Sequence, residues 1–174
     1  MSNNDIKALI DKYQIRAKKK LGQNFITDSN IIRKMVNLSN ISSASTVIEI
    51  GPGLGILTKE LAKQARQVIA YEIDSKLVLL LKERFLEDTN IEIIEADFLS
   101  LDIKQELEKR KIEKAVVCAN LPYYITTPLL FKLFEGEACI DSIAVMMQKE
   151  VAQRFTAIAG SKDYNALSVI TLKI

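Results

Sequence analysis

The chain has 174 residues, 48% of them hydrophobic and 26% charged, which fits one folded domain and excludes intrinsic disorder. The sequence contains no histidine, which excludes Ser-His and Cys-His nucleophile pairs, histidine metal sites and imidazole acid–base catalysis. Cys118 and Cys139 lie in apolar stretches, so we expect buried free thiols and no bound metal.

No apolar run reaches the roughly 20 residues of a membrane-spanning helix, and the polar N-terminus is unlike a secretory signal, so we expect a cytoplasmic protein without membrane contact.

The first 20 residues form a basic arm. They hold six basic and two acidic side chains, a charge of +4, and since the whole chain carries +2 the remaining residues carry −2. Such an arm is either a solvated terminus or a contact for nucleic-acid phosphates, and charge alone does not separate the two. The spacing of apolar residues predicts a helix at 5–13. A second helix is predicted to run to about Leu38 from a cap at Asp28 or Ser29.

From residue 46 onward, predicted strands and helices alternate. Strands are expected at 46–50, 67–72, 91–95, 115–119 and 142–147, and helices at 54–65, 75–86, 101–110, 127–134 and from 149 onward. This alternation is typical of a parallel sheet with helices on both faces, in which the carboxyl ends of the strands share one ligand-binding edge. The three prolines, Pro52, Pro122 and Pro128, all follow predicted strands. The unusual backbone chemistry is therefore concentrated at that edge.

A glycine-rich loop follows the first of these strands and reads Glu-Ile-Gly-Pro-Gly-Leu-Gly from Glu49 to Gly55. Glycine permits positive φ and close approach of a ligand to the backbone, although a plain turn can use it too. The spacing is G-x-G-x-G and differs from the G-x-G-x-x-G that holds a pyrophosphate. Glu72 ends the next strand, where an acid can accept hydrogen bonds from both ribose hydroxyls. The pattern favours an adenosine-type cofactor over a dinucleotide.

The end of the third predicted strand carries Asp97 and Phe98. Asp97 is placed to accept a hydrogen bond from an adenine amino group, and Phe98 to flank the ring. The alternative is a helix-capping aspartate followed by a core aromatic residue, and the local sequence leaves both open.

The fourth predicted strand ends in Asn120-Leu121-Pro122-Tyr123. An adenine N6 amine is a poor nucleophile because its lone pair is delocalised into the ring. The Asn120 side-chain carbonyl and the Leu121 backbone carbonyl are suited to hold both amine hydrogens and favour an attacking geometry. Pro122 stiffens the turn, and Tyr123 offers a face on which an extruded base can stack. The alternative is an Asn-x-Pro turn with an exposed tyrosine, and the position of the motif at a strand end beside the glycine-rich loop disfavours it.

Several separate motifs make the chain resemble the small-subunit ribosomal RNA adenine N6,N6-dimethyltransferases, the KsgA type. The matching segments are 19–25, 51–55, Glu72, Asp97, 120–123, 126–131, 147–152 and 160–164. The resemblance implies a Rossmann-like class I methyltransferase fold that binds S-adenosylmethionine, with an open, mostly parallel sheet. The expected cofactor site comprises Gln23, Asn24, Ile26, Gly51, Gly53, Gly55, Glu72, Ile73, Asp97, Phe98 and Asn120. The expected acceptor site comprises Asn120, Leu121, Pro122 and Tyr123.

The family resemblance also implies a reaction and a target. We expect transfer of methyl groups to N6 of two adjacent adenosines near the 3′ end of 16S ribosomal RNA in a 30S precursor, by a monomer that acts in ribosome biogenesis. Residues 1–174 are expected to form the catalytic domain, with 1–27 as a basic arm over the cofactor. The final β-hairpin and the helical C-terminal domain of the family are expected to be missing.

Three alternatives stay open at this stage. Erythromycin-resistance methyltransferases share the catalytic core but modify large-subunit RNA. They usually have isoleucine at the position of Leu121, and they lack the proline matching Pro128 and the Gln-Lys-Glu run at 148–150. A non-catalytic RNA-binding assembly factor on the same fold is the second alternative. A dinucleotide-dependent oxidoreductase is the third, and the glycine spacing disfavours it.

Overall fold

A computed structural model describes residues 3–15, 28–121, 123–135, 139–158 and 160–162. In chain order the elements are α1 (Asn3–Lys12), α2 (Ser29–Leu38), β1 (Thr46–Ile50), α3 (Ile56–Ala62), β2 (Gln67–Glu72), α4 (Ser75–Arg84), β3 (Ile91–Glu95), the 3₁₀ helix η2 (Phe98–Ser100), α5 (Ile103–Lys109), β4 (Ala115–Asn120), α6 (Tyr123–Glu135), β5 (Ile140–Met146) and α7 (Lys149–Phe155).

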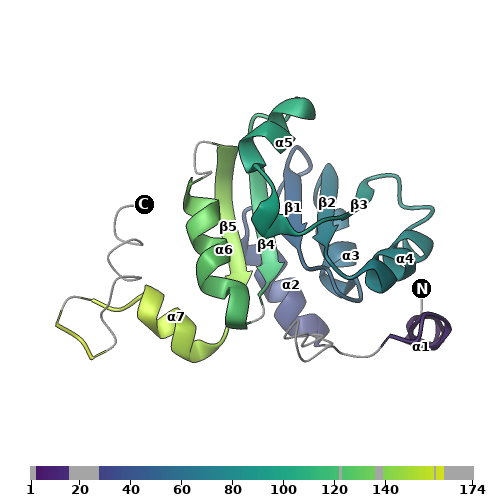
Figure 1. Ribbon diagram of the computed structural model, residues 1–174, viewed down its shortest axis with the longest axis horizontal. Helices are drawn as coiled ribbons and strands as arrows, with labels where there is room; N and C mark the ends of the chain where they lie inside the picture. Colours follow the sequence, from purple (N-terminus) through teal and green to yellow (C-terminus); the bar gives the residue numbers. More distant parts are fainter. Residues whose placement is uncertain (1–2, 16–27, 122, 136–138, 159, 163–174) are drawn as a thin grey trace.

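The five strands form one parallel sheet in the order β3-β2-β1-β4-β5 (Figure 1). The predicted open α/β sheet is therefore confirmed. The chain builds outward from β1 in one direction through β2 and β3, and then in the other through β4 and β5. The carboxyl ends of β1 and β4 flank the point where this direction reverses, which is where ligands bind in sheets of this type.

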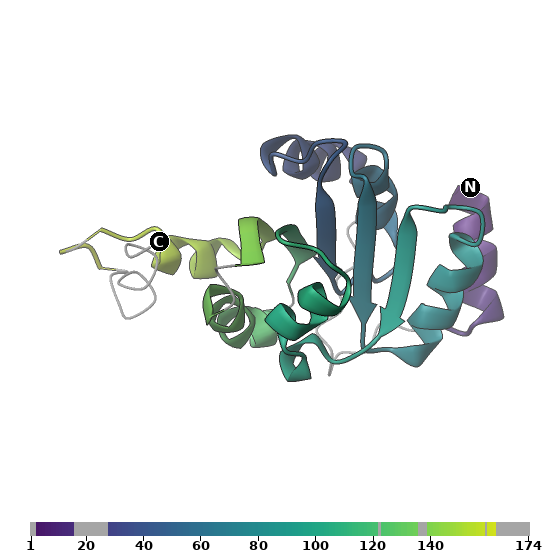
Figure 2. The ribbon, with the colours of Figure 1, turned by 90° about the horizontal axis from the view of Figure 1, so that it is seen from above.

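Helices cover both faces of the sheet, as the continuous apolar strands require. Ile48 and Ile50 of β1 belong to a buried cluster that includes Leu107 of α5 and Leu133 of α6. Val47 belongs to a second cluster on the opposite face, formed with α2 and α3. A third cluster joins α1 and α4, so α1 lies at the β3 end of the molecule, far from α7 in both views (Figures 1 and 2).

Aspartates mark where several helices begin. The Asp28 carboxylate accepts a hydrogen bond from the Asn30 N–H at 2.8 Å, and Asp74 accepts one from the Lys76 N–H at 3.1 Å. Asp102 likewise caps α5, so this helix begins at Ile103 and not at the predicted residue 101. α6 departs further from prediction, because it begins at Tyr123 and contains Pro128 in its interior.

Among the described residues, no helix combines the length and apolar character needed to cross a bilayer. Cys118 is buried in β4 and Cys139 is half-buried, and both are free thiols. Burial raises the pKa of the Cys118 thiol to about 12, which makes it an unreactive core residue.

Candidate functional site

The predicted site residues of four strands meet at one edge of the sheet. Gly51 directly follows β1, Glu72 ends β2, Asp97 comes two residues after β3, and Asn120 ends β4. Because all strands run parallel, these positions lie along the same carboxyl edge (Figure 1). The fold thus brings together residues that are up to 69 positions apart in the sequence, as counted from Gly51 to Asn120.

The glycine loop has the left-handed backbone that its composition predicts. Gly51, Gly53 and Gly55 have φ of 67°, 58° and 75°. A Cβ at Gly51 would meet no atom of the described residues within 4 Å, so its backbone faces space that these residues leave open. A Cβ at Gly55 would lie 2.6 Å from the Phe85 ring, so this glycine is needed for packing against α4. The loop therefore has one open side and one side pressed against the protein.

Glu72 supports the glycine loop from the neighbouring strand. One carboxylate oxygen accepts a hydrogen bond from the Gly53 N–H at 3.2 Å, and the other accepts bonds from the N–H groups of Ile73 at 2.9 Å and Asp74 at 3.0 Å. Burial raises the pKa of Glu72, and these three backbone donors act in the opposite sense. An ionised carboxylate has about four acceptor positions. Three of these positions accept backbone hydrogen bonds, so about one is left to accept a hydrogen bond from a ligand. A second becomes available if a ligand replaces the Gly53 N–H, whose hydrogen bond is the longest.

Glu49, which the sequence analysis did not single out, lies one residue before the end of β1 and is 1% exposed. Its Oε2 and the hydroxyl of the equally buried Thr58 in α3 have no hydrogen-bond partner among the described residues. The pKa of Glu49 is raised to about 8, chiefly by burial; the nearby Glu72 charge acts in the same direction, whereas the polar groups of Thr58 and the Arg84 charge act in the opposite direction. The only sequence signal was a single acid inside a β-branched run.

For Asp97 and Phe98 the sequence left two alternatives open: contact with an adenine, or a helix cap followed by a core aromatic residue. The Asp97 carboxylate is exposed and caps η2, accepting a hydrogen bond from the Leu99 N–H at 3.0 Å. The Phe98 side chain is 5% exposed and packs edge-to-face on Tyr71, with ring centroids 5.4 Å apart. Their contacts in the protein are thus those of a cap and a core aromatic residue. Contact of either residue with an adenine stays a prediction.

Asn120 is half-buried at the end of β4, paired with Met146 of β5. The following residue, Leu121, is 6% exposed, and its N–H donates to the Met146 carbonyl at 3.0 Å. These contacts hold the start of the predicted acceptor motif against β5. Tyr123 begins α6, directly beyond the motif's proline.

Four of the predicted residues, Gln23, Asn24, Ile26 and Pro122, lie outside the described residues, as does the basic run at 16–20. Ile73, directly after Glu72, is 52% exposed and places an apolar side chain beside the carboxylate. No group of three or more metal-ligating side chains occurs within the described part of the chain.

Comparison of the sequence with known proteins identifies a family. The model of a family described as ribosomal RNA adenine dimethylase matches residues 14–173. The ribosomal RNA small subunit methyltransferase A of Staphylococcus carnosus (strain TM300) is 46% identical over 166 residues, which cover 94% of this chain and 56% of that protein. The chain thus spans little more than half the length of this relative.

Two solved structures resemble the fold at more than a quarter sequence identity. The crystal structure of the 23S rRNA methyltransferase ErmE superposes with a TM-score of 0.75 at 32% identity, covering 86% of this chain and 57% of that one. A dimethyladenosine transferase from Plasmodium falciparum gives a TM-score of 0.73 at 30% identity, covering 84% of this chain and 51% of the other.

Proposed function

Because the chain belongs to the ribosomal RNA adenine dimethylase family, we propose that it transfers methyl groups from S-adenosylmethionine to N6 of two adjacent adenosines near the 3′ end of 16S ribosomal RNA. The observation that carries this proposal is the meeting of the glycine loop, Glu72, Asp97 and Asn120 at the edge where the sheet reverses direction. The partner would be a 30S precursor in the cytoplasm, bound by a monomer.

The cofactor side of the proposal rests on the glycine loop and Glu72. The open backbone at Gly51 gives room for a methionine moiety, and the remaining acceptor position of Glu72 suits a ribose hydroxyl. The exposed Ile73 side chain would contact one face of the adenine. When bound, S-adenosylmethionine supplies an electrophilic methyl group on a sulfonium, so the protein needs no histidine base.

The acceptor side of the proposal rests on Asn120 and Leu121. Their carbonyl oxygens would accept hydrogen bonds from the two hydrogens of the adenine amine and so orient its lone pair toward the methyl donor. The hydrogen bond from the Leu121 N–H to Met146 fixes the backbone at this point. Tyr123, at the first position of α6, would stack on the extruded base.

Sequence similarity favours the small-subunit target over the large-subunit one. The relative named as a small-subunit methyltransferase is 46% identical, whereas ErmE, a 23S rRNA enzyme, is 32% identical. The chain also keeps Leu121, Pro128 and the Gln-Lys-Glu run at 148–150, which the resistance enzymes usually lack.

The test is transfer of labelled methyl groups to unmethylated small and large ribosomal subunits, with a full-length small-subunit methyltransferase A as positive control. Calorimetric titration of the chain with S-adenosylmethionine and with NAD runs in parallel. We expect binding of S-adenosylmethionine alone and label in 16S RNA at N6 of adenine. Label in 23S RNA would move the chain to the resistance type. Binding of the cofactor without transfer, both in this chain and in one extended by the C-terminal region of the family, would favour a non-catalytic assembly factor.

A further inference from the structure

We propose that Arg84, at the C-terminal end of α4, is a positioning residue that holds the glycine loop in its ligand-binding shape. The inference rests on the proposed function, since it assigns the loop to the cofactor. The Arg84 Nη1 donates a hydrogen bond to the backbone carbonyl of Leu54, which lies between the second and third glycines of the loop. Arg84 is thirty positions from Leu54 in the sequence.

The environment of Arg84 makes this hydrogen bond strong. The guanidinium lies over the Phe85 ring, 5.1 Å from its centroid, and is partly shielded from water. Burial lowers the pKa of Arg84, while the charges of Asp88 and Glu49 raise it. A hydrogen bond from a charged donor in such surroundings contributes more than a neutral one. The Leu54 carbonyl thus accepts a hydrogen bond from a cationic side chain.

Phe85, which directly follows Arg84 at the end of α4, supports the loop by steric contact. The Phe85 ring would clash with any side chain at Gly55, so the ring touches the backbone where the loop enters α3. The Leu54 side chain is itself buried in the cluster that contains Phe85, Leu81 and Leu9 of α1. The last part of the loop is therefore held by its carbonyl through Arg84 and by its side chain through the apolar cluster.

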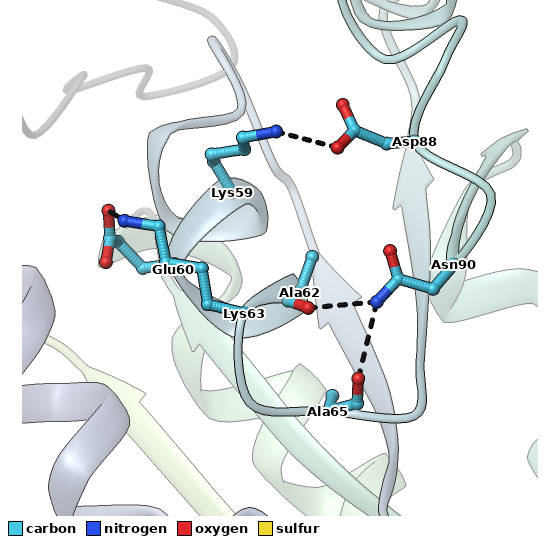
Figure 3. A network of polar contacts seen from close by, with 7 residues as sticks. All are labelled: Lys59, Glu60, Ala62, Lys63, Ala65, Asp88 and Asn90. Atoms are coloured by element: carbon cyan, nitrogen blue, oxygen red, sulfur yellow. Dashed lines mark hydrogen bonds and ion pairs between the residues drawn. The ribbon is translucent and has the colours of Figure 1, made fainter. Parts of the chain in front are cut away.

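The turn after α4 fixes the helix that follows the loop (Figure 3). The Lys59 Nζ of α3 forms an ion pair with Asp88 at 2.7 Å. The Asn90 side-chain amide donates to the carbonyls of Ala62 at 2.9 Å and Ala65 at 3.3 Å, at the C-terminal end of α3. Segment 84–90 thus contacts both the glycine loop and α3. Of these contacts, only that of Arg84 reaches a carbonyl inside the loop.

Hydrogen bonds from two different elements hold the glycine loop. Glu72 of β2 accepts from the Gly53 N–H, and Arg84 of α4 donates to the Leu54 carbonyl, so adjacent residues are held from two different elements. Loss of the Arg84 contact would leave a partly buried carbonyl unpaired and let the peptide between Leu54 and Gly55 rotate. Ligand binding would then have to order the loop first, which weakens affinity.

The experiment compares Arg84→Met, Arg84→Lys and the control Lys82→Met, which alters an exposed lysine on the same helix. We expect R84M to bind S-adenosylmethionine about tenfold more weakly in calorimetry well below its melting temperature, R84K to recover most of the affinity, and K82M to match the wild type. In ligand-free protein, amide exchange at Gly53 and Gly55 should accelerate in R84M, whereas exchange in β4 should not.

The exchange measurement separates a positioning role from general loss of stability. Acceleration in the loop and in β4 alike would overturn the proposal, and so would an R84M affinity within twofold of the wild type. If the wild-type chain does not bind S-adenosylmethionine at all, the proposed function fails, but loop exchange in R84M still decides the role of Arg84.

Discussion

Replacing Glu49 with glutamine should make the protein more stable at alkaline pH and leave it nearly unchanged at pH 5. The folded protein raises the pKa of Glu49 to about 8 from an ordinary 4.5, chiefly by burial. The folded state therefore holds this proton more tightly than the unfolded state does. Stability is lost as pH rises from about 4.5 to about 8, and this group contributes no further change above that range.

The size of the effect follows from this difference. At about 1.36 kcal/mol per pH unit, the interval between 4.5 and about 8 corresponds to roughly 5 kcal/mol. That value is an upper limit, because a rearrangement or an entering water would relieve part of the cost of burying the charge. Glutamine has the shape of the protonated acid and does not ionise. We therefore expect E49Q to exceed the wild type by about 2–5 kcal/mol at pH 9.

The assay is urea unfolding of the wild type, E49Q and the control Glu95→Gln at pH 5, 7 and 9. Glu95 is an exposed carboxylate at the end of β3, so its replacement should shift stability little at every pH. The stability of E49Q should still fall somewhat as pH rises, because burial also raises the pKa of Glu72. Wild-type stability that stays flat from pH 5 to 9, or an E49Q difference that is the same at every pH, would refute the reasoning.

Three further substitutions test the site. Gly55→Ala should cost roughly 2–4 kcal/mol in urea unfolding, because φ is 75° and the new Cβ would meet the Phe85 ring; a loss below 1 kcal/mol would contradict that contact. Glu72→Ala should weaken binding of S-adenosylmethionine more than tenfold and also lower stability by about 2–3 kcal/mol, since three backbone donors lose their acceptor; unchanged calorimetric affinity would count against the ribose contact. Asn120→Ala should reduce methyl transfer by about a hundredfold or more with cofactor affinity nearly intact, and equal losses in both would argue against its acceptor role.

Local sequence was sufficient for the bounds of the first three strands and for placing the predicted site motifs along one edge of the sheet, whereas β5 begins at Ile140 and not at the predicted residue 142. β1, β2 and β3 begin and end where the apolar runs predict. Gly51 directly follows β1, Asn90 directly precedes β3, and Asp74 lies two residues after β2, all residue types that favour turns. The positions of Gly51, Glu72, Asp97 and Asn120 at one edge followed from the rule that strands of a parallel sheet share their carboxyl ends. For α6 the local pattern was misleading, since a helix was predicted at 127–134, whereas α6 begins at Tyr123 and contains Pro128 in its interior.

What only the tertiary structure decided are the contacts between segments distant in the sequence. The Gly53 amide that donates to Glu72, the Glu49 carboxylate oxygen without a partner among the described residues, and the reach of Arg84 to Leu54 each depend on how neighbouring strands and helices pack. A residue's own sequence neighbourhood sets its backbone preference, but its burial and its partners come from elements brought to it by the fold. The sequence thus determined where the glycine loop, Glu72 and Asn120 stand, and packing determined which groups hold them there.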